Sequence, residues 1–248
     1  MRHRVVKRLS RHGTGLAAVL GVALGAVPLH GQAPKYTPGT ILYPSQMKPW
    51  STRMAVGVSF IAMPSAIVME AAAIRWPLFG YDIAMGLPKH FSLTGVVSTE
   101  IVTNHFELGG RWEADLTSRL HADVGVSGAY WFGQMKNAIF DNTVHGWFTY
   151  PSVSLGYDFG RLALTAQAKA SYVNSVYIRS GQLESQSSTN MFNGMSYRVA
   201  LEQPFFKHTT IGLAFQMNRL KFYYPQWPLF PTFDRSFWMP EAQFRFTL

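Results

Sequence analysis

The feature that most constrains this chain is a regular alternation of apolar and polar residues over positions 104–132. Every second residue is apolar or small from Phe106 to Leu116, and again from Leu120 to Phe132 after a short turn. The residues between them carry most of the charge of this stretch. Because successive side chains of a β-strand point to opposite faces, the period of two predicts a hairpin with one apolar and one charged face. The hairpin alone does not decide which face points inward.

The N-terminus has the composition of an export signal. Five basic residues and no acidic one precede a short apolar run at positions 16–29, and small residues follow as far as Ala33. That run is too short to span a bilayer comfortably, so residues 1–33 are predicted to be a secretory signal peptide, with an N-terminal membrane anchor as the alternative. The chain has no cysteine, which excludes a disulfide framework and an anchor on a lipidated cysteine.

The basic character of the chain comes largely from this segment. Five of its 22 basic residues lie there, so the remaining residues carry a net charge of about +4 instead of +9. This balance gives no reason to expect nucleic acid as a partner. No later window holds 18 uninterrupted apolar residues, which excludes a helical membrane protein. An exported all-β chain remains, either a soluble sandwich or a transmembrane barrel.

Ten segments alternate with a period of two and are expected to be strands, namely 54–63, 79–87, 91–102, 104–116, 120–132, 146–158, 161–174, 195–206, 209–223 and 237–248. Residues 34–52, rich in proline and polar side chains, are expected to form an extended periplasmic lead-in. A change of parity after Asn218 predicts a β-bulge in the ninth segment. Segments of this length suit tilted strands that cross about 25 Å of hydrocarbon.

The connections between these segments differ at the two ends. Tight turns are expected at 88–90, 117–118, 159–160 and 207–208, and long loops at 64–78, 133–145, 176–193 and 224–236, with a short turn at 103–104. Short periplasmic turns and long extracellular loops are typical of outer-membrane barrels. Residues 53–248 are therefore predicted to form a closed antiparallel transmembrane β-barrel of about ten strands. Eight or twelve strands are alternatives, because Ser65 to Trp76 could form a loop with a short helix or a further strand.

Aromatic residues cluster near the expected strand ends, where interfacial girdles of a barrel lie. Toward the loops these are Tyr130, Trp131, Phe132, Trp147, Phe148, Tyr150, Phe222, Tyr223, Tyr224, Phe237 and Trp238. Two loops have a distinctive composition. Residues 181–193 are rich in Ser, Asn and Gln and are expected to form a mobile loop. Residues 224–233 are rich in aromatics and proline and are expected to form a lid over the barrel mouth or a contact surface.

The last segment places Ala242, Phe244, Phe246 and Leu248 at alternate positions. This pattern, together with the alternation of the whole chain, resembles the outer-membrane β-barrel proteins of Gram-negative bacteria. Members of that class typically end in an aromatic residue, and here a leucine stands in its place. The resemblance implies localisation in the bacterial outer membrane, with Phe244, Phe246 and Leu248 as an assembly signal. It implies outer-membrane lipid and the barrel-assembly machinery as partners.

If the apolar faces meet lipid, the charged faces line the barrel interior. A turn at 117–118 would pair Glu113 with Asp123 and Asp115 with His121 across the hairpin. We therefore expect a luminal charge network of Arg111, Glu113, Asp115, Arg119, His121, Asp123, Lys169, Arg198, Glu202, Glu241 and Arg245. Unpaired charges in a poorly hydrated interior are costly, so the expected role of this network is to fill the lumen. A ligand or ion path is the alternative.

No catalytic, metal or cofactor motif stands out in the sequence. Omptin-like proteases place Asp–Asp and Asp–His pairs near the extracellular rim, and barrel lipid hydrolases place a histidine two residues before a serine. We expect no histidine here to have a serine at that spacing and no Asp–His pair near the long loops, so His105 with Glu107 remains the candidate near the rim.

The expected function is therefore a non-enzymatic outer-membrane protein, either structural or binding an extracellular or small-molecule ligand through its loops. A narrow solute channel and a surface enzyme acting on lipid or peptide are the alternatives. Because ten strands enclose a lumen barely wider than its own side chains, we expect the lumen to be closed.

Overall fold

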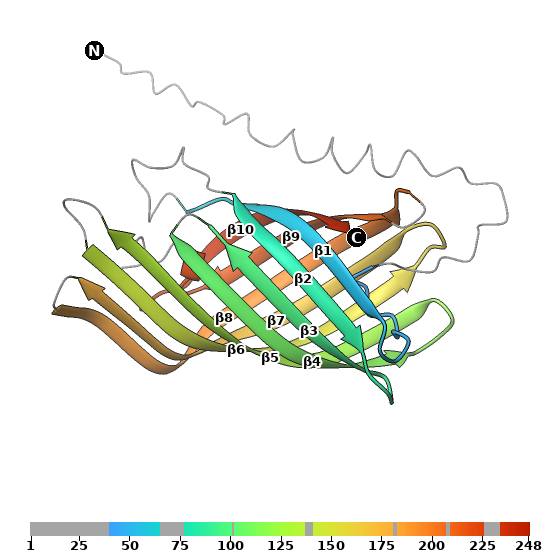
Figure 1. Cartoon of the computed structure of the whole chain (residues 1–248), viewed down its shortest axis with the longest axis horizontal. Coiled ribbons are helices and arrows are strands. Elements are labelled where there is room, and N and C mark those ends of the chain that lie inside the picture. Colours follow the sequence, from blue (N-terminus) through green and yellow to red (C-terminus); the bar gives the residue numbers. More distant parts are fainter. Residues whose placement is uncertain are drawn as a thin grey trace, which may run out of the picture. The chain divides into compact units, whose positions relative to one another are not determined.

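The computed structural model describes residues 40–64, 77–100, 102–136, 141–180, 183–206, 209–225 and 234–248. Within these residues the chain forms a closed antiparallel barrel of ten strands (Figure 1). No helix in this part of the chain is long and apolar enough to cross a membrane. The prediction of a ten-stranded closed barrel is confirmed.

The strands follow one another around the barrel in chain order, and β1 pairs with β10 to close it. Their bounds are β1 Thr52–Ile61, β2 Leu78–Gly86, β3 Phe91–Thr99, β4 Thr103–Asp115, β5 Leu120–Lys136, β6 Asp141–Asp158, β7 Ala163–Ser180, β8 Leu183–Pro204, β9 Thr210–Leu220 and β10 Phe237–Thr247. Closure leaves no strand edge unpaired, which a barrel in lipid requires because the hydrocarbon offers backbone groups no hydrogen-bond partner. We call the end where β1 begins and β10 ends the turn end, and the opposite end the loop end.

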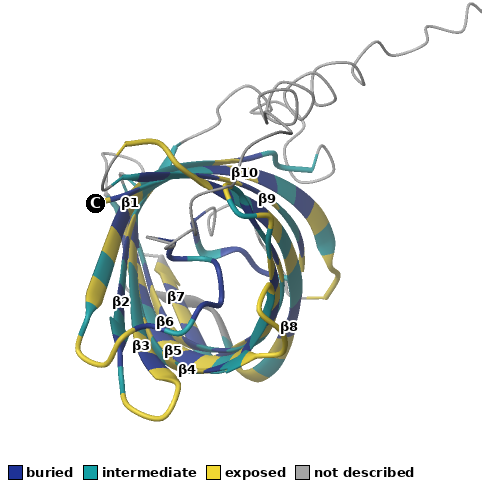
Figure 2. Ribbon diagram, turned by 90° about the vertical axis from the view of Figure 1, so that its right-hand side faces the viewer, coloured by how far each residue is buried: buried dark blue, intermediate teal, exposed yellow. Residues whose placement is uncertain are grey.

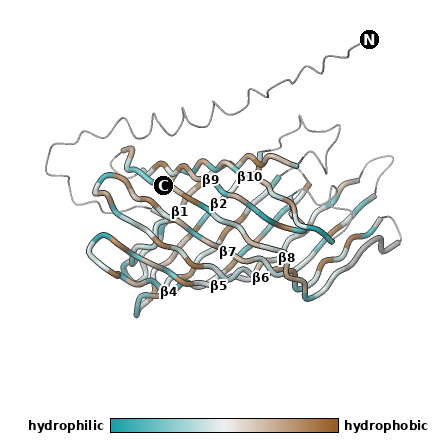
Figure 3. Tube along the Cα trace, turned by 180° about the vertical axis from the view of Figure 1, so that it is seen from behind, coloured by the Kyte–Doolittle hydropathy of each residue, from teal (hydrophilic) through white to brown (hydrophobic). Residues whose placement is uncertain are grey.

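The apolar face of the central hairpin points outward. Leu108 and Val126 are 63% and 55% exposed, whereas Glu113 and Asp123 on the other face are each 1% exposed. Burial alternates in the same way along the other strands, and so does hydropathy (Figures 2 and 3). An apolar exterior around a polar interior is the arrangement of a transmembrane barrel. The observed geometry agrees with the prediction that the apolar faces point outward, toward lipid.

Two of the predicted long loops are wrong. Residues 133–145 belong mostly to the paired ends of β5 and β6, which continue to Lys136 and Asp141. Most of residues 176–193, including the stretch from 183 onward, likewise belong to β7 and β8, paired as far as Ser180 and Leu183. The polar residues of these two stretches favoured a loop interpretation. Strand pairing continues through them, and inward-facing apolar residues such as Val144 and Val176 belong to one buried cluster there. The four strands of these two hairpins, β5 to β8, are longer than any other strand of the barrel.

The predicted β-bulge after Asn218 is also wrong. β9 pairs without any shift of register as far as Leu220, with β8 on one side and β10 on the other. Leu220 keeps the inward parity of Asn218, and both side chains are buried. The register shifts that do occur lie between Trp147 and Phe148 and at two places in the β7–β8 pair. The apparent change of parity marks the point where the chain leaves the sheet.

Several predictions fall outside the described residues. These are the signal peptide at 1–33, the first part of the lead-in, the stretch Ser65 to Trp76, and the loop 224–233 beyond Pro225.

A lipid-facing arginine tests the assignment of the two faces. Leu108→Arg places a charge on the outer face of β4, midway along the strand, and should lower the free energy of unfolding by about 2–4 kcal/mol. Leu116→Arg is the matched control, because Leu116 is also exposed but lies in the turn between β4 and β5, where the cost should be about 0–1 kcal/mol. Denaturant-dependent refolding into lipid vesicles measures both. Equal losses for the two variants would contradict a lipid-facing Leu108.

Candidate functional site

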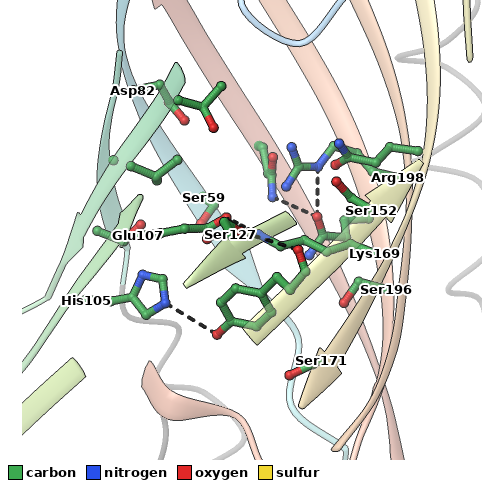
Figure 4. Close-up of a pocket in the computed structure, with 18 of the residues that line it drawn as sticks. Ser59, Asp82, His105, Glu107, Ser127, Ser152, Lys169, Ser171, Ser196 and Arg198 are labelled. Carbon is green, nitrogen blue, oxygen red and sulfur yellow. Dashed lines mark hydrogen bonds and ion pairs between the residues drawn. The ribbon is translucent and has the colours of Figure 1, made fainter. Parts of the chain in front are cut away.

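The inward-facing side chains of the barrel enclose a polar chamber with a volume of about 200 Å³. Its floor at the turn end includes Ile41 and Leu42, and its roof at the loop end includes Phe148, Phe222 and Tyr224. Charged, amide and hydroxyl side chains from most of the strands form the wall between them (Figure 4). The chamber is the candidate functional site of the chain.

The floor is built by residues 40–47, which we call the strap. The strap belongs to the predicted lead-in, and it folds into the barrel at the turn end (Figure 2). The buried carboxylate of Glu202 on β8 accepts the backbone N–H groups of Ile41, Leu42 and Tyr43 at 3.0, 3.2 and 2.8 Å. These charge-assisted hydrogen bonds satisfy three buried donors with one acidic side chain. Glu202 therefore binds the strap directly, and it also interacts electrostatically with Arg245.

Further contacts seat the strap on the inner wall. Arg53 donates to the carbonyl of Thr40 at 2.9 Å and to the hydroxyl of Ser45 at 3.2 Å. The ring of Tyr43 meets His121 edge-on, with 5.4 Å between centroids. Burial raises the pKa of the Tyr43 hydroxyl, so this group stays protonated and donates to the backbone carbonyl of Arg119 at 3.4 Å.

A glycine makes room for the strap on β6. A Cβ atom at Gly156 would lie 2.5 Å from Cδ of Pro44 and 2.6 Å from the ring of Tyr43. Any other residue at this position would therefore push the strap away from the wall. The close approach explains a glycine on an inward-facing strand position.

The roof is an aromatic cluster, defined by Trp131, Phe148, Tyr150, Phe222, Tyr223 and Tyr224. The centroids of Trp131 and Phe222 are 5.3 Å apart, and Tyr224 stacks on His105 at 4.3 Å. The prediction that these six aromatics form a lipid-facing girdle is wrong. Three of them have the inward parity of their strands, and the other three follow the end of β9, where the chain turns into the lumen. Phe132, Trp147 and Trp238 do point outward.

An ion pair crosses the chamber between facing walls. Nζ of Lys169 on β7 lies 2.8 and 2.9 Å from the two carboxylate oxygens of Glu107 on β4 (Figure 4). Ser127 donates a further hydrogen bond to Glu107 at 2.6 Å, and the Lys169 ammonium lies 4.3 Å from the centroid of the Tyr150 ring. Both partners are mostly buried, so this pair ties the two sides of the barrel together.

The charges of the β4–β5 hairpin form two separate groups. Arg111 lies 3.7 Å from Glu113 and 3.9 Å from Asp123, and Ser92 donates to Glu113 at 2.8 Å. Asp115 and His121 form a second pair at the exposed turn. The structure pairs Glu113 with Asp123 and Asp115 with His121 in the register expected from the sequence. Arg119 is exposed in the turn and makes no ion pair among the described residues.

The remaining predicted charges lie on β8 and β10. Arg245 pairs with Asp82 of β2. Glu241 accepts hydrogen bonds from the amides of Asn218, Gln216 and Gln243 at 3.1, 3.3 and 2.9 Å. Nε of Arg198 donates to the Gln216 carbonyl oxygen at 2.8 Å.

The eleven predicted charges therefore form several directly bonded groups, and those on β8 and β10 also interact electrostatically with one another and with Asp82 and Glu107. Sequence reasoning missed two partners, Asp82 and Glu107, as members of the luminal set. The inward parity of Asp82 on β2 is a sequence signal that could have placed it in the lumen. Glu107 was assigned to the candidate enzyme site with His105 instead.

The expected enzyme pair at the rim does not form. His105 is buried beneath the aromatic cluster, where Nε2 lies 3.3 Å from the Tyr150 hydroxyl, while Glu107 is held by Lys169. One histidine, His90, does precede a serine by two residues, so the expectation that no histidine has this spacing is wrong. His90 is exposed in the turn before β3, whereas Ser92 is buried and donates to Glu113. The described residues also contain no group of three acidic or histidine side chains that could hold a metal ion.

No protein-family model matches the chain, and no curated protein matches it either. Solved outer-membrane barrels resemble it at low identity. Ail of Yersinia pestis is 8% identical, with a TM-score of 0.39, over 81% of this chain and 100% of that chain. The translocator domain of the autotransporter NalP from Neisseria meningitidis is 9% identical, with a TM-score of 0.43, over 94% and 95%. Outer membrane phospholipase A from Escherichia coli is 12% identical, with a TM-score of 0.37, over 86% and 93%.

At these identities and TM-scores the similarity assigns no function to the chain. Its own geometry, a closed antiparallel barrel with an apolar exterior, is the architecture of bacterial outer-membrane proteins.

Glu100, in the connection between β3 and β4, makes the stability of the loop end depend on pH. Burial raises the pKa of this carboxyl from 4.5 to about 7, so the folded barrel holds a proton that the unfolded chain releases. The stabilisation is complete below pH 4.5 and is lost as the pH rises through about 7. Glu100→Gln should remove about 1–2 kcal/mol of this pH dependence, after allowance for partial exposure. Unfolding midpoints between pH 4 and 8 check this, and an unchanged profile would contradict it.

Removal of the Glu202 carboxylate should release the strap. Glu202→Ala leaves three buried N–H groups without an acceptor, each at a cost of about 1–3 kcal/mol unless the strap leaves the wall. We expect protease cleavage within residues 40–50 to become at least tenfold faster while the barrel stays folded. Gln203→Ala is the matched control, because Gln203 is the exposed neighbour on the same strand. Equal cleavage of the two variants would show that Glu202 does not hold the strap.

Proposed function

We propose that this chain is a non-enzymatic outer-membrane barrel with a closed lumen, which acts as a structural or binding protein and not as a solute channel. The observation that carries this proposal is the strap, held across the turn end by the carboxylate of Glu202. In this reading, solutes have no open path along the barrel axis. Outer-membrane lipid and the barrel-assembly machinery are the proposed partners of the barrel surface.

Two further layers support a closed lumen. The pair of Glu107 and Lys169 joins facing walls at the level of the chamber. Above it, buried aromatic side chains fill the loop end, where Trp131 and Phe222 are 0% and 1% exposed. Three successive obstacles therefore lie along the lumen, two of them largely apolar. A conducting pore of the porin type has a water-filled interior instead.

The enzyme alternative has weaker support. His105 is buried, with its Nε2 at the Tyr150 hydroxyl. His90 is exposed, whereas the hydroxyl of Ser92 is buried and donates to Glu113, so the two side chains do not form a catalytic pair. A general base must lie within hydrogen-bond reach of the group it activates. Binding of a partner through the extracellular loops remains part of the proposal, since the sequence between β1 and β2 and between β9 and β10 is long enough to provide such loops.

Planar-bilayer recording tests the closed lumen. The purified wild-type barrel should insert without discrete conductance steps, because the strap, the ion pair and the aromatic cluster lie in series. Glu202→Ala should produce steps only when combined with Lys169→Ala, which removes the second obstacle, and with Trp131→Ala, which opens the third. Gln203→Ala with the same Lys169→Ala and Trp131→Ala changes is the control and should stay silent. Regular steps from the wild-type protein would overturn the proposal and favour a channel.

A further inference from the structure

Two cations of the chamber, Arg111 and Arg198, use little of their hydrogen-bonding capacity, and of the two Arg111 lies within 4.0 Å of carboxylates whereas Arg198 does not. Among the described residues, the Arg198 guanidinium makes a single hydrogen bond, from Nε to Gln216, and has no carboxylate within 4.0 Å. Its two terminal nitrogens line the cavity without a protein acceptor. A guanidinium offers five N–H donors in a planar fork, so most of the donors of Arg198 are free for another molecule.

The acidic groups near Arg198 are occupied elsewhere. Asp82 pairs with Arg245, and Glu107 pairs with Lys169. Both oxygens of Glu241 accept hydrogen bonds from amide side chains, and Gln216 stands between this carboxylate and Arg198 because it contacts both. The Arg245 guanidinium is also close enough to Arg198 for mutual repulsion. The carboxylates of Glu241, Asp82 and Glu107 attract Arg198 without contacting it, so its terminal N–H groups remain available to a further acceptor.

A hydroxyl group on the same wall is also without a partner. Ser152 of β6 lines the chamber, and no hydrogen bond joins it to any other residue that the structure describes. The strand order places it opposite Lys169, which in turn stands opposite Ser196, two residues before Arg198. Figure 4 shows Ser152, Ser196 and Arg198 on one side of the chamber, facing Glu107 and His105. An arginine fork and a hydroxyl two strands apart therefore face the same chamber.

We propose that the chamber binds a small hydroxycarboxylate, with the carboxylate on the terminal nitrogens of Arg198 and the hydroxyl on Ser152. A planar carboxylate matches the guanidinium fork and forms two parallel hydrogen bonds with it. The chamber, with a volume of about 200 Å³, has room for a ligand of a few heavy atoms. This inference goes beyond the proposed closed lumen, which would hold with or without a ligand.

The test uses sodium lactate as the probe and lactamide as its neutral counterpart. The full chain is refolded into detergent micelles in the presence of either compound, at constant ionic strength, so that binding does not depend on access through the closed ends. Lactate should raise the thermal unfolding midpoint in a concentration-dependent way, and the dependence gives a dissociation constant. Lactamide, which lacks the charge, should have no effect. Equal effects of the two compounds, or no effect of lactate, would overturn the proposal.

Variants assign the effect to the site. Arg198→Gln should weaken lactate binding at least tenfold, and Arg198→Lys, which keeps the charge but loses the fork, should weaken it about fivefold. Ser152→Ala should weaken it threefold or more and leaves the charge of the chamber unchanged. Arg219→Gln is the matched control, because Arg219 is an exposed cation on β9 that lies over Trp238, and lactate binding should be unaffected.

The same preparations separate the two proposals. Retention of the heat-modifiable folded form on a gel shows that each variant forms the barrel. Lactate binding unchanged by Arg198→Gln would overturn the ligand site and leave the closed lumen standing. Conductance in the wild-type protein would overturn the closed lumen and leave the binding result standing.

Discussion

The organisation of this barrel depends on one constraint, namely that the apolar face of every strand points outward and contacts the surrounding lipid. The polar face is then left to fill the interior, where each charge and each backbone group needs a partner away from bulk water. The chain satisfies this demand with local groups such as Arg111 with Glu113 and Asp123, and with the pair of Lys169 and Glu107 across the lumen. Apolar and aromatic packing is confined to the two ends of the lumen.

This division of the interior supports the proposal that the site is a chamber and not a pore. At one end the strap inserts Ile41 and Met47 against Ala55 and Ala84. At the other end the aromatic cluster packs against apolar residues of the extended hairpins. Between them the wall carries charged side chains, several of them paired, whereas Arg198 and Glu241 form no ion pair among the described residues. The proposed binding function in the lumen therefore rests on the unused donors of Arg198.

Sequence reasoning succeeded where a local period of two was enough. The alternation predicted ten strands, the outward apolar faces, and the register that pairs Glu113 with Asp123. It failed at the loop end, because the composition of 183–193 suggested a loop although the ladder of β7 and β8 continues there. It also failed for the aromatics. Trp131 and Phe132 are adjacent in sequence, yet one is buried in the lumen and the other is exposed to lipid.

The sequence by itself determined the architecture, since the direction of each side chain in a strand follows from its parity. Only the tertiary structure decided which inward residues meet across the lumen. Glu202 and Ile41 are 161 residues apart in the chain, and Lys169 and Glu107 are 62 apart. No local pattern encodes such contacts, because they arise when the barrel closes and the lead-in folds back inside it. The physical reason is that each strand pairs with the strands next to it in the chain, whereas the packing of the lumen depends on side chains from all ten strands and the strap.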